Sequence, residues 1–513
     1  MTDCDLLIVG GGTGGCAAAM AAAHLGLHTV MTEPYDWVGG QLTSQCVPPD
    51  EHPWIEHFGC TARYRAFREG VRAHYRAFED LREDQEYLNP GGGWVSRLCH
   101  RPDIGHSVLR SMLSPNLDLR LGWIPLRTVT EKDQVVSVEL EHTASKDRDT
   151  IRPRFVIDAT ETGDLLPMTG TDHLLGAEGK IRTAEPHAID GPDEPDNHQG
   201  LTWCAVVGFD PHSDHTIERP QQYDFWRHYQ PRGWPDKLLS FKMLHVRHGE
   251  VIDFPLFGNN GFNLFQYRQI VNKDLHNDDR EDATVMNWPM NDYYLGTVVD
   301  APVQEAVDRL VGARQLTLSM LYWLQTEAPR HDGGLGYPEL RLRPDLTGTD
   351  DGLAMAPYVR ESRRIAALHT VREQDVAADC LEDCDRANPI EDSVGVGAYR
   401  IDLHPSTNER PTIDLSSVPF QIPMRSLVPV RAKNLLPGCK NIGTTHITNG
   451  CFRLHPVEWN IGESAATLAA YCMSKGETPQ DVCGTTKKVR DVQDSLRAQG
   501  VELEWPTVPL RAL

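Results

Sequence analysis

The sequence predicts an α/β fold in which a parallel sheet lies between helices, with a second unit inserted into it. An apolar run at residues 6–9 leads into a glycine-rich loop and then into a helix of small residues. A further strand, residues 28–32, ends in Glu33. Another strand ends at Gly438 and precedes a second small-residue helix near the C-terminus. Strand, loop, helix and strand in this order are typical of a Rossmann-type unit, built here from discontinuous segments.

The loop at residues 10–15 has the spacing G-x-G-x-x-G. Its three glycines serve the tight turn, the approach of backbone to a pyrophosphate, and the packing of helix on strand. The helix that follows would direct its positive N-terminus at the diphosphate. The residues expected to bind a dinucleotide are Gly10, Gly12, Thr13, Gly14 and Gly15. A glycine turn with a purely structural role is the alternative.

Glu33 lies eighteen residues beyond Gly15, where a carboxylate accepts hydrogen bonds from an adenosine ribose. An acid there favours a free 2′-hydroxyl over a 2′-phosphate. A glycine pair follows, which would let backbone pass close to a second part of a long cofactor. The residues expected to make that contact are Pro34, Gly39, Gly40 and Gln41. This requirement favours FAD over a nicotinamide nucleotide alone.

Composition narrows the class of protein. A chain of 513 residues is long enough for two or three folding units. The net charge of −23 and the lack of a basic run argue against a nucleic acid or an anionic membrane as partner. No apolar stretch approaches the ~20 residues that cross a bilayer, and the first residues lack the positive region of a signal peptide. We therefore expect no membrane association and a cytoplasmic protein.

Between the cofactor segments, apolar spacing predicts a long helix at residues 61–87 and a second helix at 103–113. Strands at 117–121 and 135–141 have the pattern of a β-meander, and residues 154–159 form a further strand. That strand runs into Asp-Ala-Thr-Glu-Thr-Gly-Asp, which contains Thr160 and Gly163. A strand followed by a polar turn is the alternative reading of this segment.

The composition then changes, because loops rich in Pro, Asp and His separate strand-like residues 201–207 and a helix at 303–327. We expect four parts: an FAD-binding unit at 1–170 with a helical insertion at about 46–100, an α+β substrate domain at 171–424, a return to the FAD-binding unit at 425–475, and a helical tail at 476–513. The substrate domain would cover the flavin, since binding sites commonly lie between domains.

Three of these segments resemble parts of the flavoprotein class that shares its fold with glutathione reductase and p-hydroxybenzoate hydroxylase. They are the glycine pair at 39–40, the strand end at Thr160 and Gly163, and the segment from Gly438 into the last helix. The class places its last helix with the N-terminus against the flavin pyrimidine, which implies a helix start near Glu458. By that resemblance Asn460 and Ile461 would lie beside the flavin.

The chain as a whole resembles the FAD-dependent oxidoreductase family of this class. Further phrases typical of that family are found at residues 267–268, 287–293, 358–365 and 422–429. The resemblance implies FAD as cofactor and leaves the substrate open. The chain departs from the family at one place, where Gly438-Cys439-Lys440 replaces the usual Gly-Arg.

A flavin accepts a hydride at N5, so the protein must hold a C–H bond there and offer a base for the proton. The connection before the last helix contains the first catalytic candidates, His446, Arg453 and His455, together with Glu458. Each has a structural alternative, as a hydrogen-bonded histidine or an ion-paired arginine. Arg360, Arg363 and Arg364 suggest an anion site or ordinary ion pairs. Second-line candidates are Tyr267, Arg268, Asn291, Asp292, Tyr293 and His404, and Cys46 could approach or tether the flavin.

Three hypotheses follow for the function. The first is an FAD-dependent dehydrogenase or oxidase of a small polar metabolite, for which an anion is one option, with oxygen or an unknown carrier as electron acceptor. The second is a flavin monooxygenase that uses NAD(P)H and oxygen. The third is a non-catalytic binding scaffold, against which the complete phosphate loop argues. No metal site is expected, and the oligomeric state stays open.

Overall fold

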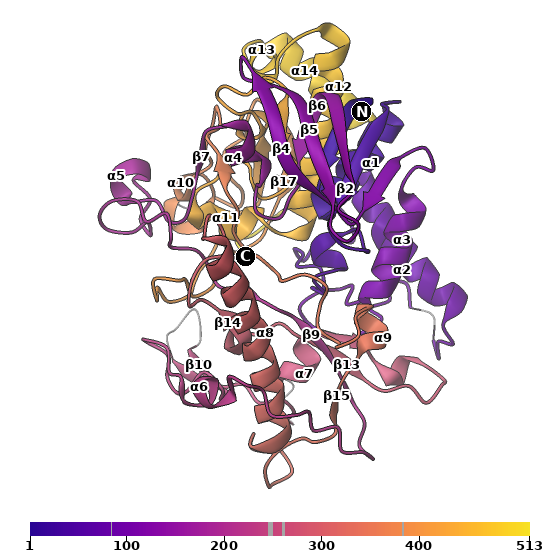
Figure 1. Cartoon of the computed structure of the whole chain (residues 1–513), viewed down its shortest axis with the longest axis vertical. Helices are drawn as coiled ribbons and strands as arrows, with labels where there is room; N and C mark the ends of the chain where they lie inside the picture. Colours follow the sequence, from indigo (N-terminus) through magenta and orange to yellow (C-terminus); the bar gives the residue numbers. More distant parts are fainter. Residues whose placement is uncertain (84, 245–249, 259–261, 382–383) are drawn as a thin grey trace.

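The computed structural model describes residues 1–83, 85–244, 250–258, 262–381 and 384–513. Its largest sheet has the order β3-β2-β1-β6-β5-β4, and β21 pairs with the end of β6 (Figure 1). The strands are β1 Thr2–Val9, β2 Thr29–Glu33, β3 Asp118–Leu121, β4 Trp123–Glu131, β5 Gln134–His142, β6 Arg148–Asp158 and β21 Leu435–Pro437. The predicted α/β fold with a parallel sheet is therefore confirmed.

The register of the parallel strands brings the cofactor segments to one edge of this sheet. Val9 pairs with Asp158, and Asp158 pairs with Pro437. On the other side of β1, Val9 pairs with Thr32. Gly10, Glu33 and Gly438 therefore follow aligned strand ends, which is where ligands bind in open α/β sheets.

One predicted strand has a different place from the one expected. The run at 117–121 does not begin the meander but joins the parallel sheet beside β2, as β3. The meander consists of β4, β5 and β6, which pair in antiparallel fashion. We did not predict β4, because Pro125 and Arg127 interrupt its alternation of apolar and polar residues.

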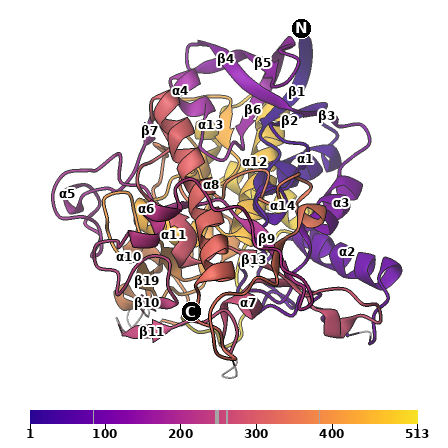
Figure 2. The ribbon, with the colours of Figure 1, turned by 60° about the horizontal axis from the view of Figure 1, so that its bottom comes forward.

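Two buried helices cross over the sheet. Helix α1 (Thr13–His24) is rich in alanine and packs against α12 (His455–Lys475), followed by α13 (Pro479–Cys483) and α14 (Thr486–Ala498). Helices α2 (Ala62–Phe78) and α3 (Pro102–Met112) lie together on one side of the molecule, opposite α5 (Lys180–Thr183), in both Figure 1 and Figure 2.

The predicted helix 61–87 is shorter than expected. Thr61 caps it, since its hydroxyl accepts a hydrogen bond from the Tyr64 amide at 3.1 Å. The helix ends at Phe78, because the chain then turns to pair with residues 275–277: the Arg82 amide donates to the Leu275 carbonyl at 2.9 Å. Residue 84 of the predicted range lies outside the described residues.

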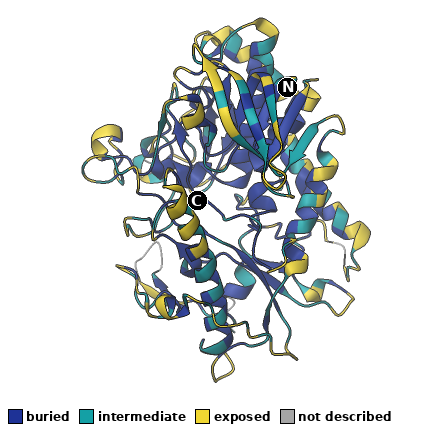
Figure 3. Cartoon of the chain, in the orientation of Figure 1, coloured by how far each residue is buried: buried dark blue, intermediate teal, exposed yellow. Residues whose placement is uncertain are grey.

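A second core forms below the first in Figure 1. An antiparallel sheet has the order β12-β13-β9-β15, and α8 (Val303–Thr326) supplies much of the apolar side-chain packing. The strands are β9 Ala205–Phe209, β12 Gln269–Val271, β13 Ala283–Met286 and β15 Leu340–Leu342. Figure 3 shows buried residues in both parts and exposed ones on the outer faces of β4 and α8.

Part of the range expected for the substrate domain packs with the first core. Strands β17 (Ser393–Gly397) and β20 (Phe420–Pro423) pair with each other and lie against α12. Val394, Phe420 and Ile422 are buried in the same cluster as the alanines of α1. The described part of the chain contains no helix that is both long and apolar enough to cross a membrane.

Candidate functional site

Three glycines of the loop at residues 10–15 are packed so closely that they leave no room for a side chain. Gly10 has φ +102°, and a Cβ on it would lie 2.2 Å from the Ala159 carbonyl oxygen. A Cβ on Gly14 would lie 1.8 Å from the Gly438 oxygen, and one on Gly15 would lie 2.0 Å from the Gly10 oxygen. The predicted loop, the strand end at β6 and Gly438 therefore meet at one point.

The predicted glycine pair lies against this loop. The Gly39 amide donates to the Gly11 carbonyl at 2.7 Å, and the Thr13 hydroxyl donates to the Gly39 carbonyl at 3.0 Å. The first turn of α1 contains no acidic residue, and Gly12 caps it without a side chain. The two segments thus form a glycine-lined cradle at a positive helix N-terminus, which suits a diphosphate.

Glu33 is buried at the end of β2. Its Oε2 accepts a hydrogen bond from the Gly11 amide at 2.9 Å, and its Oε1 accepts one from the Tyr35 amide at 3.2 Å. Burial raises the pKa of this carboxyl to about 8, against the lowering effect of the two amides. Pro34, by contrast, is exposed, and its contact with the cofactor stays a prediction.

A buried charged cluster that we did not predict stands at the mouth of the cradle. Lys440 Nζ lies 2.5 Å from Glu161 Oε2 and 3.6 Å from Glu458 Oε1. A Cβ on Gly12 or on Gly40 would lie 2.9 Å from Glu161 Oε1, so that carboxylate faces both glycine segments. Burial alone would lower the pKa of Lys440, but the two carboxylates raise it above its usual value. Burial raises the pKa of Glu458 to about 7, while Lys440 opposes the change.

The strand end at β6 is held by its own side chains. The Thr160 hydroxyl donates to Asp158 Oδ1 at 2.7 Å and accepts from the Asp164 amide at 2.7 Å. Gly163 has φ +66° and makes the turn that follows. Thr160 is therefore used in fixing the loop beside Gly10, which leaves its backbone rather than its hydroxyl for a cofactor.

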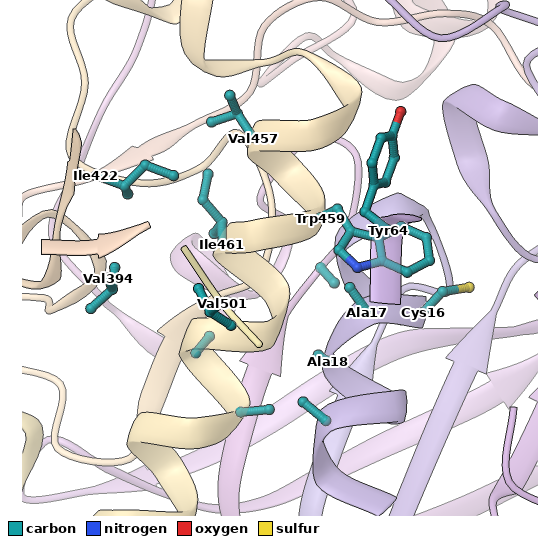
Figure 4. Close-up of a cluster of buried hydrophobic side chains, with 14 of the residues drawn as sticks. Cys16, Ala17, Ala18, Tyr64, Val394, Ile422, Val457, Trp459, Ile461 and Val501 are labelled. Carbon is teal, nitrogen blue, oxygen red and sulfur yellow. The ribbon is translucent and has the colours of Figure 1, made fainter. Parts of the chain in front are cut away.

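The last helix begins earlier than we predicted. It starts at His455, with Pro456 in its first turn, rather than near Glu458. Asn460 and Ile461 consequently lie in the second turn, and they face the core: Asn460 Nδ2 donates to the Val394 carbonyl at 2.9 Å. Figure 4 shows Ile461 on the side of α12 that faces Val394 and Ile422. Neither side chain lies at the helix N-terminus, and the contact of these two residues with the flavin stays a prediction.

The connection before α12 contains a helix that we did not predict, α11 (His446–Phe452), capped by Thr445. His446 lies in a buried ionic network: its Nδ1 is 2.5 Å from Glu361 Oε1, and its amide donates to Glu178 Oε2 at 2.8 Å. The structure thus gives His446 carboxylate partners on two sides, as the structural alternative for this residue requires.

The three clustered arginines are also paired. Arg360 Nη2 is 3.1 Å from Asp292, Arg363 contacts Asp164 and Asp300, and Arg364 Nη2 is 2.8 Å from Glu178. They lie in an extended segment and in strand β16 (Arg364–Ile365). Ion pairing accounts for all three.

Arg453 and His455 lie where α11 meets α12, next to the glycine pair. The Arg453 carbonyl accepts a hydrogen bond from Gln41 Nε2 at 3.1 Å, and its Nη1 donates to the Tyr358 hydroxyl at 2.5 Å. His455 Nδ1 accepts a hydrogen bond from the Asp50 amide at 3.0 Å. Burial, together with nearby cations, lowers the pKa of His455 well below its usual value, so this imidazole stays neutral.

A cavity of about 770 Å³ opens beside this junction. Four of its polar lining residues come from two distant segments, Tyr267 and Arg268 from one and Asp402 and His404 from the other. Asp402 Oδ2 lies 3.3 Å from Arg453 Nη2. The contacts from Asp402 to Arg453 and from Arg453 to Gln41 therefore connect the cavity with the glycine cradle.

His404 stands between two carboxylates on the cavity wall. Its Nδ1 is 2.5 Å from Asp292 Oδ2, and its Nε2 is 3.5 Å from Asp402 Oδ2. Asp292 is fully buried and is also hydrogen-bonded to Thr202 at 2.5 Å. His404 and Arg453 hold the pKa of Asp402 below its usual value despite the burial that would raise it.

Two second-line candidates lie elsewhere. The Asn291 amide is used within its own turn and against Thr317, and Tyr293 packs against Trp226. Conversely, Tyr399, Asp402 and Asp50 belong to the polar surroundings of the cavity and were not predicted. Asp50 and Tyr399 stand in irregular segments and Asp402 in a short strand, and the spacing of these residues carries no chemical pattern.

Comparison with known proteins decides the family. The model of the family described as FAD dependent oxidoreductase matches residues 5–496. The chain belongs to this family. It is thus an oxidoreductase with FAD as its cofactor. A comparison with curated proteins found no match.

Several solved structures are similar to parts of this flavoprotein. The myxobacterial chondrochloren halogenase CndH is 14% identical over 42% of this chain and 46% of its own, with a TM-score of 0.24. L-proline dehydrogenase from P. horikoshii is 16% identical over 35% and 25%, with a TM-score of 0.18. The rebeccamycin biosynthetic enzyme RebC with reduced flavin is 16% identical over 41% and 38%, with a TM-score of 0.24. The chain spans less than half the length of each.

The residues present fit FAD. A Cβ on Gly12 would point into the space between the two glycine segments, where the cradle offers backbone amides to a diphosphate. Glu33 would accept hydrogen bonds from the adenosine ribose, and Lys440 would place a cation beside the phosphates. Gln41 and the backbone of Arg453 stand on the path from this cradle to the cavity, so the flavin end would lie toward the cavity.

Cys46 is unsuited to tethering the flavin. It is buried against Cys204 and has φ +59°, and burial raises its pKa well above the usual value. A thiol that stays protonated is a poor nucleophile. The position therefore favours a packing role for Cys46.

Proposed function

We propose that this flavoprotein is an FAD-dependent dehydrogenase or oxidase that takes a hydride from a small polar metabolite bound in the 770 Å³ cavity. The observation that carries the proposal is the line of contacts from the cavity through Asp402 and Arg453 to Gln41 of the cradle. When bound, FAD supplies a hydride acceptor at N5. The protein's own residues must then bind the substrate and receive its proton.

Arg268 is the residue that we expect to bind the substrate's acceptor group. It is 8% exposed, and neither its Nε nor its Nη1 has a hydrogen-bond acceptor among the described residues. Its nearest counter-ion is Asp50, with 3.9 Å between Nη1 and Oδ1. Because a buried guanidinium gains most from charge-assisted hydrogen bonds, an anionic or strongly polar group would fill this place.

His404 is the residue that we expect to take the proton. Asp292 holds its Nδ1, so that Nε2 is the nitrogen available on the cavity side. A carboxylate fixed behind an imidazole sets its tautomer and stabilises the imidazolium that forms. Asp402, 3.5 Å from Nε2, would stabilise the same charge.

The proposal is tested by anaerobic addition of a metabolite panel to the FAD-loaded protein. We expect one compound class to bleach the flavin absorbance, and oxygen uptake during turnover then separates an oxidase from a dehydrogenase that needs another carrier. Rapid bleaching by NAD(P)H, with oxygen consumed and a hydroxylated product formed, would instead establish a monooxygenase. A protein that binds FAD and is bleached by none of these would contradict both.

A further inference from the structure

Aromatic rings line one path into the cavity. Phe262 is 55% exposed at the outer end and stacks on Phe254, with ring centroids 4.4 Å apart. Phe254 lies 6.0 Å from the Tyr267 ring, and the Arg268 guanidinium carbon lies 5.1 Å from the Tyr267 centroid. Flat apolar surface therefore leads from solvent to a buried cation.

The unused hydrogen-bonding groups of the cavity are of one kind. Five lining residues have solvent-shielded side-chain atoms with no hydrogen-bond partner in the described parts of the chain: Trp234 Nε1, Arg268 Nε and Nη1, Asn287 Nδ2, Tyr294 OH and Arg410 Nη1. All of these atoms can donate a hydrogen bond, and four of the five residues offer only N–H groups there. Buried donors left unpaired are costly, and among these residues Arg268 also adjoins the aromatic path through Tyr267.

Two of the four acidic residues of the wall, Asp402 and Asp414, are paired with cations, whereas Asp253 and Glu409 are exposed to solvent. Asp402 is paired with Arg453 and His404, and Asp414 is paired with Arg400. These carboxylates already have cationic partners, whereas Arg268 has only the distant Asp50 contact at 3.9 Å. The guanidinium of Arg268 is therefore a buried charge on this wall without a close counter-ion.

We propose that the cavity binds aromatic carboxylates, with the ring against Phe254 and Tyr267 and the carboxylate on the Arg268 guanidinium. The inference rests on the proposed function in that this ligand class would include the hydride donor. It goes further, because it assigns both ends of the substrate. A planar guanidinium donates two parallel hydrogen bonds to a carboxylate, which sets the direction in which the ring enters.

The first test compares ligands on the wild-type, FAD-loaded protein. Isothermal titration calorimetry would measure the affinity of the protein for 3-phenylpropanoate, for its uncharged amide and for propanoate. We expect the aromatic acid to bind about tenfold or more tightly than either, since the amide loses the ion pair and propanoate loses the ring contacts. Equal affinity for acid and amide, or for aromatic and aliphatic acid, would overturn the inference.

Variants assign the contacts. R268M should lower affinity for 3-phenylpropanoate about tenfold or more, R268K should lower it less, and F254L should weaken the aromatic acid while leaving propanoate unchanged. R219M removes an exposed arginine that pairs with Asp224 and should bind as the wild type does. If R268M loses FAD or fails to fold, the wild-type ligand series alone decides.

Bleaching of the flavin absorbance distinguishes the failure of this inference from the failure of the proposed function. Aromatic 2-hydroxy acids and 2-amino acids are added to the FAD-loaded protein, and both their binding and the bleaching of the flavin absorbance are measured. Selective binding of aromatic acids without bleaching by any panel compound would contradict the hydride-transfer proposal and leave the ligand class intact. Bleaching by a compound that is not an aromatic acid, with no selectivity in the titrations, would overturn the ligand class alone.

Discussion

The ionisation of Glu33 should make FAD binding depend on pH. Burial raises the pKa of this carboxyl to about 8, so below that pH the cofactor-free protein holds it protonated. A ribose hydroxyl donates best to the ionised form, so binding FAD favours loss of the proton. We expect FAD affinity to rise roughly tenfold, about 1.4 kcal/mol, as the pH increases from about 6.5 to 9. Quenching of FAD fluorescence measures it.

The matched variant is E33Q, which keeps the shape and cannot ionise. It should bind FAD more weakly at pH 9, and its affinity should not change over this range. A wild-type affinity that is flat with pH, or the same slope in both proteins, would show that Glu33 does not titrate on binding.

His404 should control the rate of flavin reduction. Replacing it with Gln removes the base and keeps the volume, so H404Q should reduce flavin roughly 100-fold or more slowly, with FAD content unchanged. Stopped-flow absorbance with the bleaching compound measures this rate. The control is H215Q. His215 forms a comparable pair, with 3.0 Å between its Nε2 and Asp210 Oδ2, and neither residue lines the cavity. Wild-type rates in H404Q would exclude it as the base.

Lys440 should keep the cradle open to a diphosphate. Without its cation, Glu161 would face the phosphates unpaired, and we expect K440M to weaken FAD binding by about 2 kcal/mol, a typical value for a charged hydrogen bond. The double variant K440M/E161Q should recover much of that loss, because the repelling carboxylate is then absent. K433M, at an exposed lysine seven residues away, is the control. A double variant no better than K440M would contradict this role.

The close crossing of helices α1 and α12 depends on glycines at the point of contact, because glycine has no side chain. A Cβ on Gly462 would lie 2.0 Å from the Gly14 carbonyl oxygen, which belongs to backbone that cannot move without displacing the cradle. We expect G462A to lower the free energy of unfolding by about 1–3 kcal/mol and to reduce the FAD retained after purification. Thermal unfolding and the absorbance ratio of flavin to protein measure the two effects.

Gly484 provides the matched control for this crossing. A Cβ there would meet its nearest atom, the Gln480 oxygen, at an ordinary 3.5 Å, and the backbone is in the right-handed helical region. G484A should therefore leave stability and FAD content unchanged. If G462A is as stable as G484A, the close approach of the helices is not needed.

The elements that depend on a local pattern of residues were predictable from the sequence. The glycine loop, the alanine-rich α1 and the acid at the end of β2 each follow from residues within a short window. The helix ends were less predictable, because they depend on distant partners. Helix α2 stops where the chain pairs with residues 275–277, and α12 starts at His455, with Pro456 in its first turn, right after α11.

The cavity was predictable only in part, for the same reason. Tyr267, Arg268, Asp292 and His404 were singled out by type, but their meeting depends on contacts such as His404 with Asp292, which are 112 residues apart. Asp402 stands in a short strand, β18 (Ile401–Leu403), whose sequence gives no hint of Arg453. The burial of Lys440 was equally hidden, since both its partners come from other segments.

At the scale of the whole molecule, the cofactor segments join distant parts of the chain. The cradle uses residues near position 10 and near position 440, and the second core meets it through a small cluster that contains Cys46, Val47, Cys204 and Val206. The cavity draws its lining from residues 231–294 and 399–414. A ligand that fills both sites would therefore contact elements of both cores at once.

FAD should therefore stabilise the folded chain as a unit. A ligand that binds only the folded state adds about 2.7 kcal/mol to the free energy of unfolding when its free concentration is a hundred times Kd. We expect FAD at that excess to move the urea transition upward by the same amount when followed by far-UV circular dichroism and by tryptophan fluorescence. Trp459 reports on the first core, and Trp226, Trp288 and Trp323 report on the second.

Adenosine monophosphate is the partial ligand for this experiment. It can meet Glu33 and the α1 N-terminus but cannot span the cradle to Gln41, so it should bind more weakly and give a smaller shift than FAD at the same free concentration. K440M should show the FAD shift only at higher concentration, in proportion to its weaker Kd. If FAD moved the circular dichroism transition and left the tryptophan transition in place, the two cores would unfold independently, and the cavity between the segments 231–294 and 399–414 would not couple them.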